Sequence, residues 1–187
     1  TKIGCSVLPA SSGNTAKQLM LMKDLGVTAL CCTPSYALFL AESLHKSEDF
    51  KLSDMRLRAG AFGAEPWSEN MRAELEEKLG IKAYDIYGLT EVCGPGVGPE
   101  IIAPRTLKPL PHGEQGELVF TSLIKEGMPV VRYRTRDLTS LNYEMCKCGR
   151  TAVRMNKIMG RTDDMLIIRG VNVFPTQIES VIMEFEE

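Results

Sequence analysis

The chain of 187 residues lacks a strong charge of either sign, because 22 lysines and arginines nearly balance 24 aspartates and glutamates. Its net charge of −2 argues against nucleic acid or an anionic membrane as the main partner. No apolar run approaches the roughly 20 residues that a membrane-spanning helix needs.

The sequence also lacks a recognisable secretion signal, which would combine a charged, an apolar and a small-residue segment. The six cysteines are therefore expected to be reduced thiols of a cytoplasmic protein, not a disulfide framework. Cys31 and Cys32 fall in an apolar run, where we expect a buried strand. The chain starts inside a strand-like segment and stops in a predicted helix, so we expect a fragment of a larger enzyme.

The first ninety residues alternate between strand-like and helix-like patterns. The predicted strands are 3–8, 28–32, 55–61 and 81–86, and the predicted helices are 14–23, 34–44 and 68–79. Ser68 is placed to begin the third helix as its N-cap, and Gly80 to end it. This order predicts an α/β fold with a partly parallel sheet, flanking helices and right-handed crossovers. Ligands of such sheets bind beyond the carboxyl ends of strands.

The second half has a different texture, with frequent proline and glycine. An alternating strand at 116–121 predicts a β-rich subdomain that is antiparallel or barrel-like. A smaller unit follows, with a strand at 165–168, a turn at 170–172 and a helix from Pro175. The apolar side of that helix would carry Ile178, Val181, Ile182 and Phe185. The start of a small α+β C-terminal domain is the expected result.

The segment from Asp85 to Glu91 is the most informative motif. It places an aromatic ring, a glycine, a hydroxyl and a carboxylate beyond a predicted strand. Such a set can hold a nucleotide: ring for base, glycine for close approach, hydroxyl for phosphate and carboxylate for Mg²⁺. Taken alone, the same residues also fit a core tyrosine and a solvated glutamate.

Three other segments accompany this motif in order: Gly63-Ala64-Glu65-Pro66, Tyr133-Arg134-Thr135-Arg136-Asp137 and Gly160-Arg161-Thr162-Asp163-Asp164. The ordered set resembles the adenylate-forming enzymes, and among them the phenylacetate–CoA ligases. The resemblance covers nearly the whole chain and is closest over 132–137 and 161–179. It implies an ATP-dependent acid–thiol ligase of phenylacetate catabolism, which forms an acyl-adenylate from an aryl acid and passes the acyl group to coenzyme A.

The resemblance also implies roles for individual residues. It assigns Thr90 to phosphate, Glu91 to Mg²⁺, Asp137 to the ribose hydroxyls and Asp163 to a hinge between domains. The positions that it assigns to nucleotide or coenzyme A are Gly63, Ala64, Glu65, Pro66, Asp85, Tyr87, Gly88, Thr90, Asp137, Arg161 and Gly170.

Structural alternatives stay open for several of these residues. The 63–66 segment also fits a plain strand-to-helix turn, and Gly170 a simple turn glycine. The arginines that flank Asp137 in sequence could be its structural salt-bridge partners. An apolar slot for the aryl ring is predicted from Tyr36, Phe62, Ile86 and Pro95, each of which also fits an ordinary core position.

Two departures from the family pattern affect the expected activity. The segment 11–15 looks like a phosphate loop, but it leads directly into a helix and is better explained as the helix cap. No lysine stands in the context of the family's catalytic lysine, so we expect the chain to be inactive alone. The join between Glu100 and Ile101 is abrupt where the family has a longer excursion, which suggests omitted residues.

Cys146 and Cys148 form a Cys-x-Cys turn that fits half of a zinc site, while structural zinc needs four ligands. Cys93 and His112 are the remaining candidates, and two surface thiols are the alternative.

The resemblance divides the chain into residues 1–158, part of the adenylation domain, and 159–187, the hinge and the start of the C-terminal domain. A homodimer is compatible with the family. The alternatives to a CoA ligase are an adenylating enzyme with another acceptor and a non-catalytic nucleotide- or zinc-binding module.

Overall fold

The computed structural model describes residues 4–10, 13–92, 97–149, 151–163, 166–173 and 178. The chain forms two compact units, Thr1–Ile86 and Tyr87–Glu187. Each unit is considered by itself below. The domain boundary near residue 158 stays a prediction.

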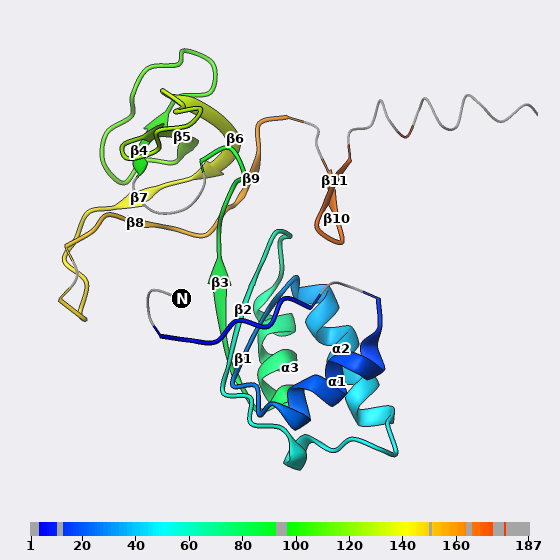
Figure 1. Cartoon of the computed structure of the whole chain (residues 1–187). Helices are drawn as coiled ribbons and strands as arrows, with labels where there is room; N and C mark the ends of the chain where they lie inside the picture. The colour runs from blue at the N-terminus through cyan, green and yellow to red at the C-terminus, as the bar shows by residue number, and fades with distance from the viewer. Residues whose placement is uncertain are drawn as a thin grey trace, which may run out of the picture. The chain divides into compact units, whose positions relative to one another are not determined.

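A parallel sheet and three helices make up the first unit (Figure 1). The strands lie in the order β1-β2-β3. They are β1 (Ala29–Cys32), β2 (Ala59–Gly63) and β3 (Lys82–Ile86), and the helices are α1 (Thr15–Asp24), α2 (Pro34–Lys46), α3 (Glu69–Leu79) and the short 3₁₀ helix η1 (Leu52–Asp54).

Capping residues set the helix boundaries in this unit. Asn14 Oδ1 accepts from the Lys17 N–H at 2.9 Å, and Ser68 Oγ accepts from the Met71 N–H at 3.2 Å. Each bond satisfies one of the free N–H groups that begin a helix. Gly80 ends α3 with φ of 63°, a left-handed conformation that glycine adopts without steric cost. The sequence predictions for these two helices are confirmed.

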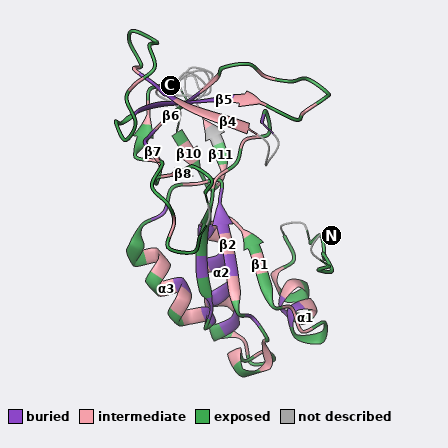
Figure 2. Cartoon of the chain, turned by 90° about the vertical axis from the view of Figure 1, so that its left-hand side faces the viewer, coloured by how far each residue is buried: buried purple, intermediate pink, exposed green. Residues whose placement is uncertain are grey.

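All three helices bury their apolar sides in one core (Figure 2). The helix residues in it are Leu19, Met22, Ala37, Leu40, Ala41, Leu44, Leu75 and Leu79. Phe62 and Ala83 join them from the strands, while Tyr84 and Ile86 of β3 stay about half exposed. Successive residues of a strand point to opposite faces, so this sheet buries one face and exposes parts of the other.

The two adjacent cysteines of β1 differ for the same reason. Cys31 is exposed and Cys32 is partly buried, so the prediction of a buried pair is wrong for Cys31. Burial, followed by the charges of Cys31 and Glu65, raises the pKa of the Cys32 thiol to about 12.

Antiparallel strands dominate the second unit (Figure 1). Its main sheet has the order β4-β5-β6-β9, and two small pairs, β7-β8 and β10-β11, accompany it. The bounds are β4 (Val97–Ile102), β5 (Gly116–Ser122), β6 (Tyr133–Thr139), β7 (Leu141–Asn142), β8 (Arg154–Met155), β9 (Gly160–Arg161), β10 (Leu166–Ile168) and β11 (Val171–Val173). Its core cluster contains Val92, Ile101, Leu118, Phe120 and Leu141.

Several sequence predictions about elements need correction. Residues 4–8 form no strand and lie exposed, because no neighbouring strand pairs with them in the described part of the chain. Strand β2 starts at Ala59, later than predicted. The predicted turn at 170–172 is shifted, since Arg169 and Gly170 make the turn with φ of 51° and 79° while Val171 begins β11. Except for Ile178, the predicted C-terminal helix lies outside the described residues.

Strand β4 runs through the Glu100–Ile101 join without a break and pairs with β5. Arg132 donates from Nε and Nη2 to the two carboxylate oxygens of Glu100, both at 3.0 Å. Within the described residues, no helix combines the length and the apolar character that crossing a membrane requires.

Candidate functional site

An irregularity in β6 positions the carboxylate at the centre of the candidate site. The pairing with β5 shifts its register between Glu117 and Val119. Within the shifted stretch Arg136 has φ of 69°, an uncommon conformation for a residue with a side chain. Thr135 and Asp137 on either side are both 5% exposed. Such bulges redirect side chains, and this one turns Asp137 into the unit.

Each oxygen of the Asp137 carboxylate has one donor. The Tyr87 hydroxyl donates to Oδ2 at 2.6 Å, and Arg161 Nη1 donates to Oδ1 at 2.6 Å. The Asp137 side chain is 7% exposed, and a buried charge is stable only when it is paired and hydrogen-bonded. Burial raises the pKa of Tyr87 well above its usual range, and the hydrogen bond to Asp137 raises it further. The phenol therefore stays a donor.

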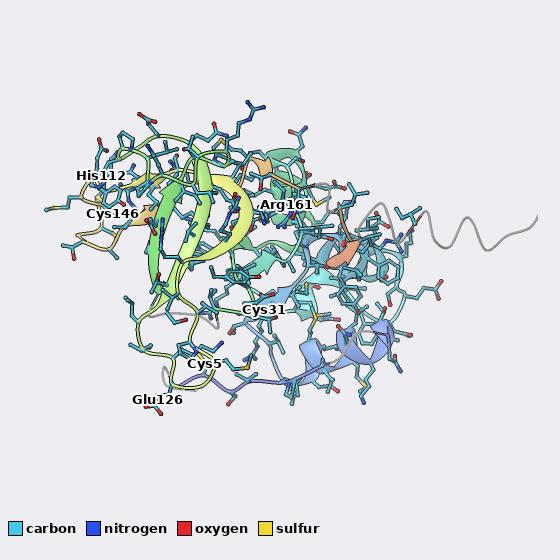
Figure 3. The ribbon with its side chains drawn as sticks, turned by 90° about the horizontal axis from the view of Figure 1, so that it is seen from above. Cys5, Cys31, His112, Glu126, Cys146 and Arg161 are labelled. Atoms are coloured by element: carbon cyan, nitrogen blue, oxygen red, sulfur yellow. The ribbon has the colours of Figure 1, made fainter. Side chains whose placement is uncertain are left out.

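Arg161, labelled in Figure 3, links Asp137 to a second carboxylate. It donates from Nε and Nη2 to the two oxygens of Asp163, at 2.7 and 2.9 Å. Its pKa is raised, first by the hydrogen bond to Asp163 and then by the charge of Asp137. The predicted ribose carboxylate and the predicted hinge residue thus share one guanidinium.

Arg134, three residues before Asp137, has another partner. Arg134 donates from Nε and Nη2 to Glu117, at 2.8 and 2.6 Å, and the Glu117 side chain is 0% exposed. The pKa of Arg134 is raised by this hydrogen bond. Thr162 Oγ1 lies 3.4 Å from Glu117 Oε2. Arg134, one of the two flanking arginines, therefore pairs with Glu117, while Arg161 forms an ion pair with Asp137.

The turn that carries Thr90 and Glu91 lies at the surface of the second unit. Both residues are exposed, and Lys125 Nζ donates to the Glu91 carbonyl oxygen at 2.8 Å. Burial, followed by the charge of Glu91 and a hydrogen bond with its carboxylate, raises the pKa of Tyr133. The charge of Arg161 lowers the pKa of the same hydroxyl, and the charge of Asp137 raises it. The predicted metal ligand and the predicted ribose ligand therefore lie in one charged neighbourhood.

The 63–66 loop of the first unit is shaped by packing. A Cβ on Gly63 would lie 2.2 Å from the Ile86 carbonyl oxygen, so only glycine fits there. Ala64 follows with φ of 67°, and Glu65 Oε1 accepts from the Ser35 N–H at 2.6 Å. The Glu65 carboxylate thus stabilises the start of α2.

Asp85 has a comparable structural position. Its Oδ1 accepts from Trp67 Nε1 at 3.0 Å, and Arg72 Nη2 lies 3.7 Å from Oδ2. The Arg72 guanidinium also lies over the Trp67 ring, 4.5 Å from its centroid. These contacts hold the end of β3 against the chain that leads into α3.

The residues predicted to line an acid pocket differ in how far they are buried. Phe62 is 0% exposed and packs edge-on against Trp67, at 5.8 Å between ring centroids, so it belongs to the core. Ile86 is 51% exposed. The Tyr36 hydroxyl is buried and has no hydrogen-bond partner among the residues that the structure describes. Pro95 lies outside the described residues.

Comparison with known proteins identifies the family. The family model described as AMP-binding enzyme matches residues 2–123, which is more than half of the chain. The chain belongs to the AMP-binding enzymes.

Within this family it is similar to phenylacetate-coenzyme A ligases. It is 48% identical over 203 aligned positions to the protein of Thermus thermophilus and 49% identical to that of Escherichia coli K12. Each alignment covers 99% of this chain but only 45% and 46% of the relative. The chain thus spans less than half the length of these relatives, and the predicted family resemblance is confirmed.

Solved structures agree with this assignment. The chain matches 2-hydroxyisobutyryl-CoA ligase in complex with 2-HIB-AMP and CoA, with a TM-score of 0.84 and 27% identity over 95% of this chain and 42% of that one. Amide bond synthetase McbA from Marinactinospora thermotolerans, at 21% identity and a TM-score of 0.64, shares the fold. The predicted α/β fold is confirmed.

The AMP-binding relatives also carry residues that this chain lacks. The alignments run over 203 positions for a chain of 187, so at least 203 − 187 = 16 positions of each relative have no counterpart here. Their placement after Glu100 stays a prediction.

Besides Gly63, two other glycines are predicted to approach ligands, and their surroundings differ. A Cβ on Gly88 would meet nothing within 4 Å, so packing does not explain a glycine there. Gly170, with φ of 79°, occupies the turn between β10 and β11, which by itself accounts for a glycine.

The Cys-x-Cys turn brings two thiols together. Cys146 Sγ and Cys148 Sγ are 3.1 Å apart, and the Gly149 N–H donates to the Cys146 carbonyl at 2.8 Å. The His112 ring, labelled with Cys146 in Figure 3, stacks on Tyr143 at 3.8 Å between centroids. Among the described residues no three metal-ligating side chains gather, and Cys93 lies outside them. The zinc site stays a prediction.

Sequence reasoning missed Glu117, Lys125 and the hydroxyl of Tyr133. Glu117 and Arg134 lie on neighbouring strands β5 and β6, so a strand-pairing argument would have found them once the register was known. Lys125 occupies a loop with no motif of its own.

Proposed function

We propose that this chain is part of an ATP-dependent acid–CoA ligase that activates phenylacetate or a similar arylacetate. The acid would become an acyl-adenylate, and the acyl group would then pass to the thiol of coenzyme A. The observation that carries this proposal is the buried Asp137 carboxylate held between Tyr87 and Arg161. Its support from similarity is the 48% identity to a phenylacetate-coenzyme A ligase along 99% of the chain.

Asp137 is suited to bind the ribose of the nucleotide. A carboxylate oxygen can accept two hydrogen bonds, and each oxygen of Asp137 has one protein donor. Each oxygen therefore keeps one acceptor position, and the two neighbouring hydroxyls of a ribose match this pair. The charge, held by Arg161, strengthens both bonds.

The exposed turn at Thr90 and Glu91 is proposed to hold the phosphates. The Thr90 hydroxyl would donate to a phosphate oxygen. Glu91 offers the hard oxygen ligand that Mg²⁺ prefers, and Mg²⁺ in nucleotide sites commonly takes one or two carboxylates together with substrate phosphates. When bound, Mg²⁺ neutralises charge on the phosphates.

In the first half-reaction, a carboxylate oxygen of the acid attacks the α-phosphorus of ATP and pyrophosphate leaves. In the second, the thiol sulfur of coenzyme A attacks the acyl carbon, the sulfur loses its proton and AMP leaves. The protein mainly positions the reactants and neutralises phosphate charge. We propose that Asp163 is the hinge at which the C-terminal domain moves between the poses for these two steps. Gly170 is proposed to lie near the coenzyme A path.

The family's catalytic lysine has no counterpart in these 187 residues. We therefore propose that the chain alone binds nucleotide and does not catalyse adenylation. We further propose a cytoplasmic enzyme, in keeping with the cysteine content and the family resemblance.

The test is pyrophosphate release by the enzyme that contains this sequence, with ATP, Mg²⁺ and phenylacetate. We expect release that depends on phenylacetate, and a loss of at least 100-fold in Glu91→Gln, comparable to removing one stabilising group in other enzymes. Glu126→Gln is the matched control, because Glu126 is exposed in the loop that carries Lys125. Full activity of Glu91→Gln, or no response to any aryl acid, would contradict the proposal.

A further inference from the structure

The hydroxyl of Tyr87 is the neutral one of the two donors to Asp137. The contact joins residues 50 positions apart in sequence, and its 2.6 Å length is typical of an O–H donor on a charged acceptor. The family resemblance assigns the ring of Tyr87 to the nucleotide base and leaves this hydroxyl without a role. The structure uses it inside the protein.

Packing fixes the position of this hydroxyl. The Tyr87 ring packs against the core cluster of the second unit and lies 6.3 Å from the Phe120 ring, measured between centroids. Because the phenol stays protonated at every physiological pH, it donates to Asp137 at all times. Tyr87 therefore gives Asp137 Oδ2 a fixed and permanent donor.

The other donor is shared. Arg161 gives one N–H to Asp137 and two to Asp163, the proposed hinge residue. A rearrangement around Asp163 therefore changes the hydrogen bonds of Arg161. Within the described residues the Tyr87 hydroxyl donates to Asp137 and forms no hydrogen bond with Asp163. A single bond to Oδ1 would also leave the carboxylate free to rotate about its Cβ–Cγ bond.

We propose that Tyr87 is the positioning residue of Asp137: its hydroxyl fixes Oδ2 so that the remaining acceptor positions of the carboxylate face the ribose hydroxyls, whatever the state of the Arg161–Asp163 pair. This inference rests on the proposed binding of ribose by Asp137. Tyr87 acts through Asp137 and contacts no reacting atom. Its consequence is a coupling: the protein distinguishes ribose from deoxyribose only while the phenol is present.

The test measures dissociation constants of the chain for AMP, 2′-deoxy-AMP and 3′-deoxy-AMP by calorimetry. We expect the wild type to bind AMP roughly tenfold more tightly than a deoxy analogue, as loss of one hydrogen bond to a charged group predicts. Tyr87→Phe keeps the ring and should lower AMP affinity by roughly tenfold while the deoxy analogues change about twofold or less. The preference for ribose should thus nearly disappear.

Three further variants serve as controls for this measurement. Tyr143→Phe removes a hydroxyl from a stacked ring elsewhere in the second unit and should leave all three constants unchanged. Asp137→Asn should abolish the ribose preference as Tyr87→Phe does. Site-specific 3-fluorotyrosine at position 87 keeps the hydroxyl and the fold, and should retain the preference.

The outcomes separate this inference from the proposed function. If Asp137→Asn loses the preference and Tyr87→Phe keeps it, Asp137 binds ribose unaided and the positioning role is wrong. If Tyr87→Phe weakens AMP and both deoxy analogues equally, the hydroxyl serves only stability, and the inference is again overturned. A wild type that binds AMP without any preference for ribose contradicts the proposed function itself.

Discussion

Asp85 and Asp137 are two aspartates near strand ends, one in each compact unit, and they have opposite characters. Asp85 is 40% exposed and accepts from Trp67, with Arg72 3.7 Å away. Asp137 is 7% exposed and holds two donors at 2.6 Å. The difference teaches that a carboxylate near a candidate site is informative when it is buried, charged and still able to accept further bonds. Asp85 supports a local fold, and Asp137 has the properties of a ligand.

The largest expected effect tests whether burial decides how much an ion pair contributes to the stability of the second unit. Arg134→Met leaves the fully buried Glu117 without its partner, which should lower the free energy of unfolding by about 3–5 kcal/mol. Arg132→Met breaks an exposed pair of similar geometry with Glu100 and should cost about 1 kcal/mol or less. Urea unfolding of both variants measures the contrast. Equal losses would show that burial does not separate the two pairs.

The second prediction compares the two aspartates directly. Asp137→Asn should reduce AMP affinity at least tenfold, because a hydrogen bond to a charged group contributes about 1.5–3 kcal/mol. Asp85→Asn should change AMP affinity by less than about twofold, since an amide oxygen still accepts from Trp67. Calorimetric titration of each variant with AMP is the measurement. A large loss in Asp85→Asn would mean that Asp85 also contributes to nucleotide binding.

The third prediction contrasts two glycines. Gly63→Ala forces a Cβ to within 2.2 Å of the Ile86 carbonyl oxygen and should lower stability by about 1–3 kcal/mol. Gly88→Ala meets open space, so its unfolding midpoint should stay near that of the wild type while nucleotide affinity falls. Thermal unfolding and AMP titration of the pair separate a packing glycine from a ligand-facing one. Destabilisation by Gly88→Ala would contradict this division.

The smallest effect concerns the cysteines of β1. The folded-state pKa of Cys32 is raised to about 12 from an ordinary value of 9.0, so the folded state keeps this proton when the unfolded state loses it. The resulting stability is complete below pH 9 and is lost as pH rises toward 12. Cys32→Ala should flatten the alkaline fall of unfolding free energy, and Cys31→Ala should not. Denaturant unfolding between pH 8 and pH 11 checks this, on the order of 1 kcal/mol.

Local features were predictable from sequence, as Asn14, Ser68 and Gly80 illustrate. Each acts on its own helix end, so the residue type and its neighbours contain the information. The family motifs also selected Asp137 and Arg161. Motif order does not give contacts, however, and the hydroxyl of Tyr87 could not be joined to Asp137 without the fold.

Strand geometry limited the other predictions. Phe62 and Ile86 were grouped in one pocket, yet Phe62 points into the core of the helices and Ile86 stays exposed. Which face a strand residue takes depends on register, which short apolar strands do not specify. The positive φ of Arg136 was equally invisible, because an arginine carries no sign of an irregular strand.

The hydrogen bond between Glu65 and Ser35 links two of the predicted ligand-binding segments. The Glu65 carboxylate ties the 63–66 loop to the Ser35 amide, next to Tyr36 at the start of α2. A substitution that moves this end of α2, where the acid pocket is predicted, should therefore also move the loop proposed for the adenine. Acid preference and nucleotide affinity should accordingly change together in laboratory evolution, and mutations that restore one should be found among those that relax the Glu65–Ser35 bond.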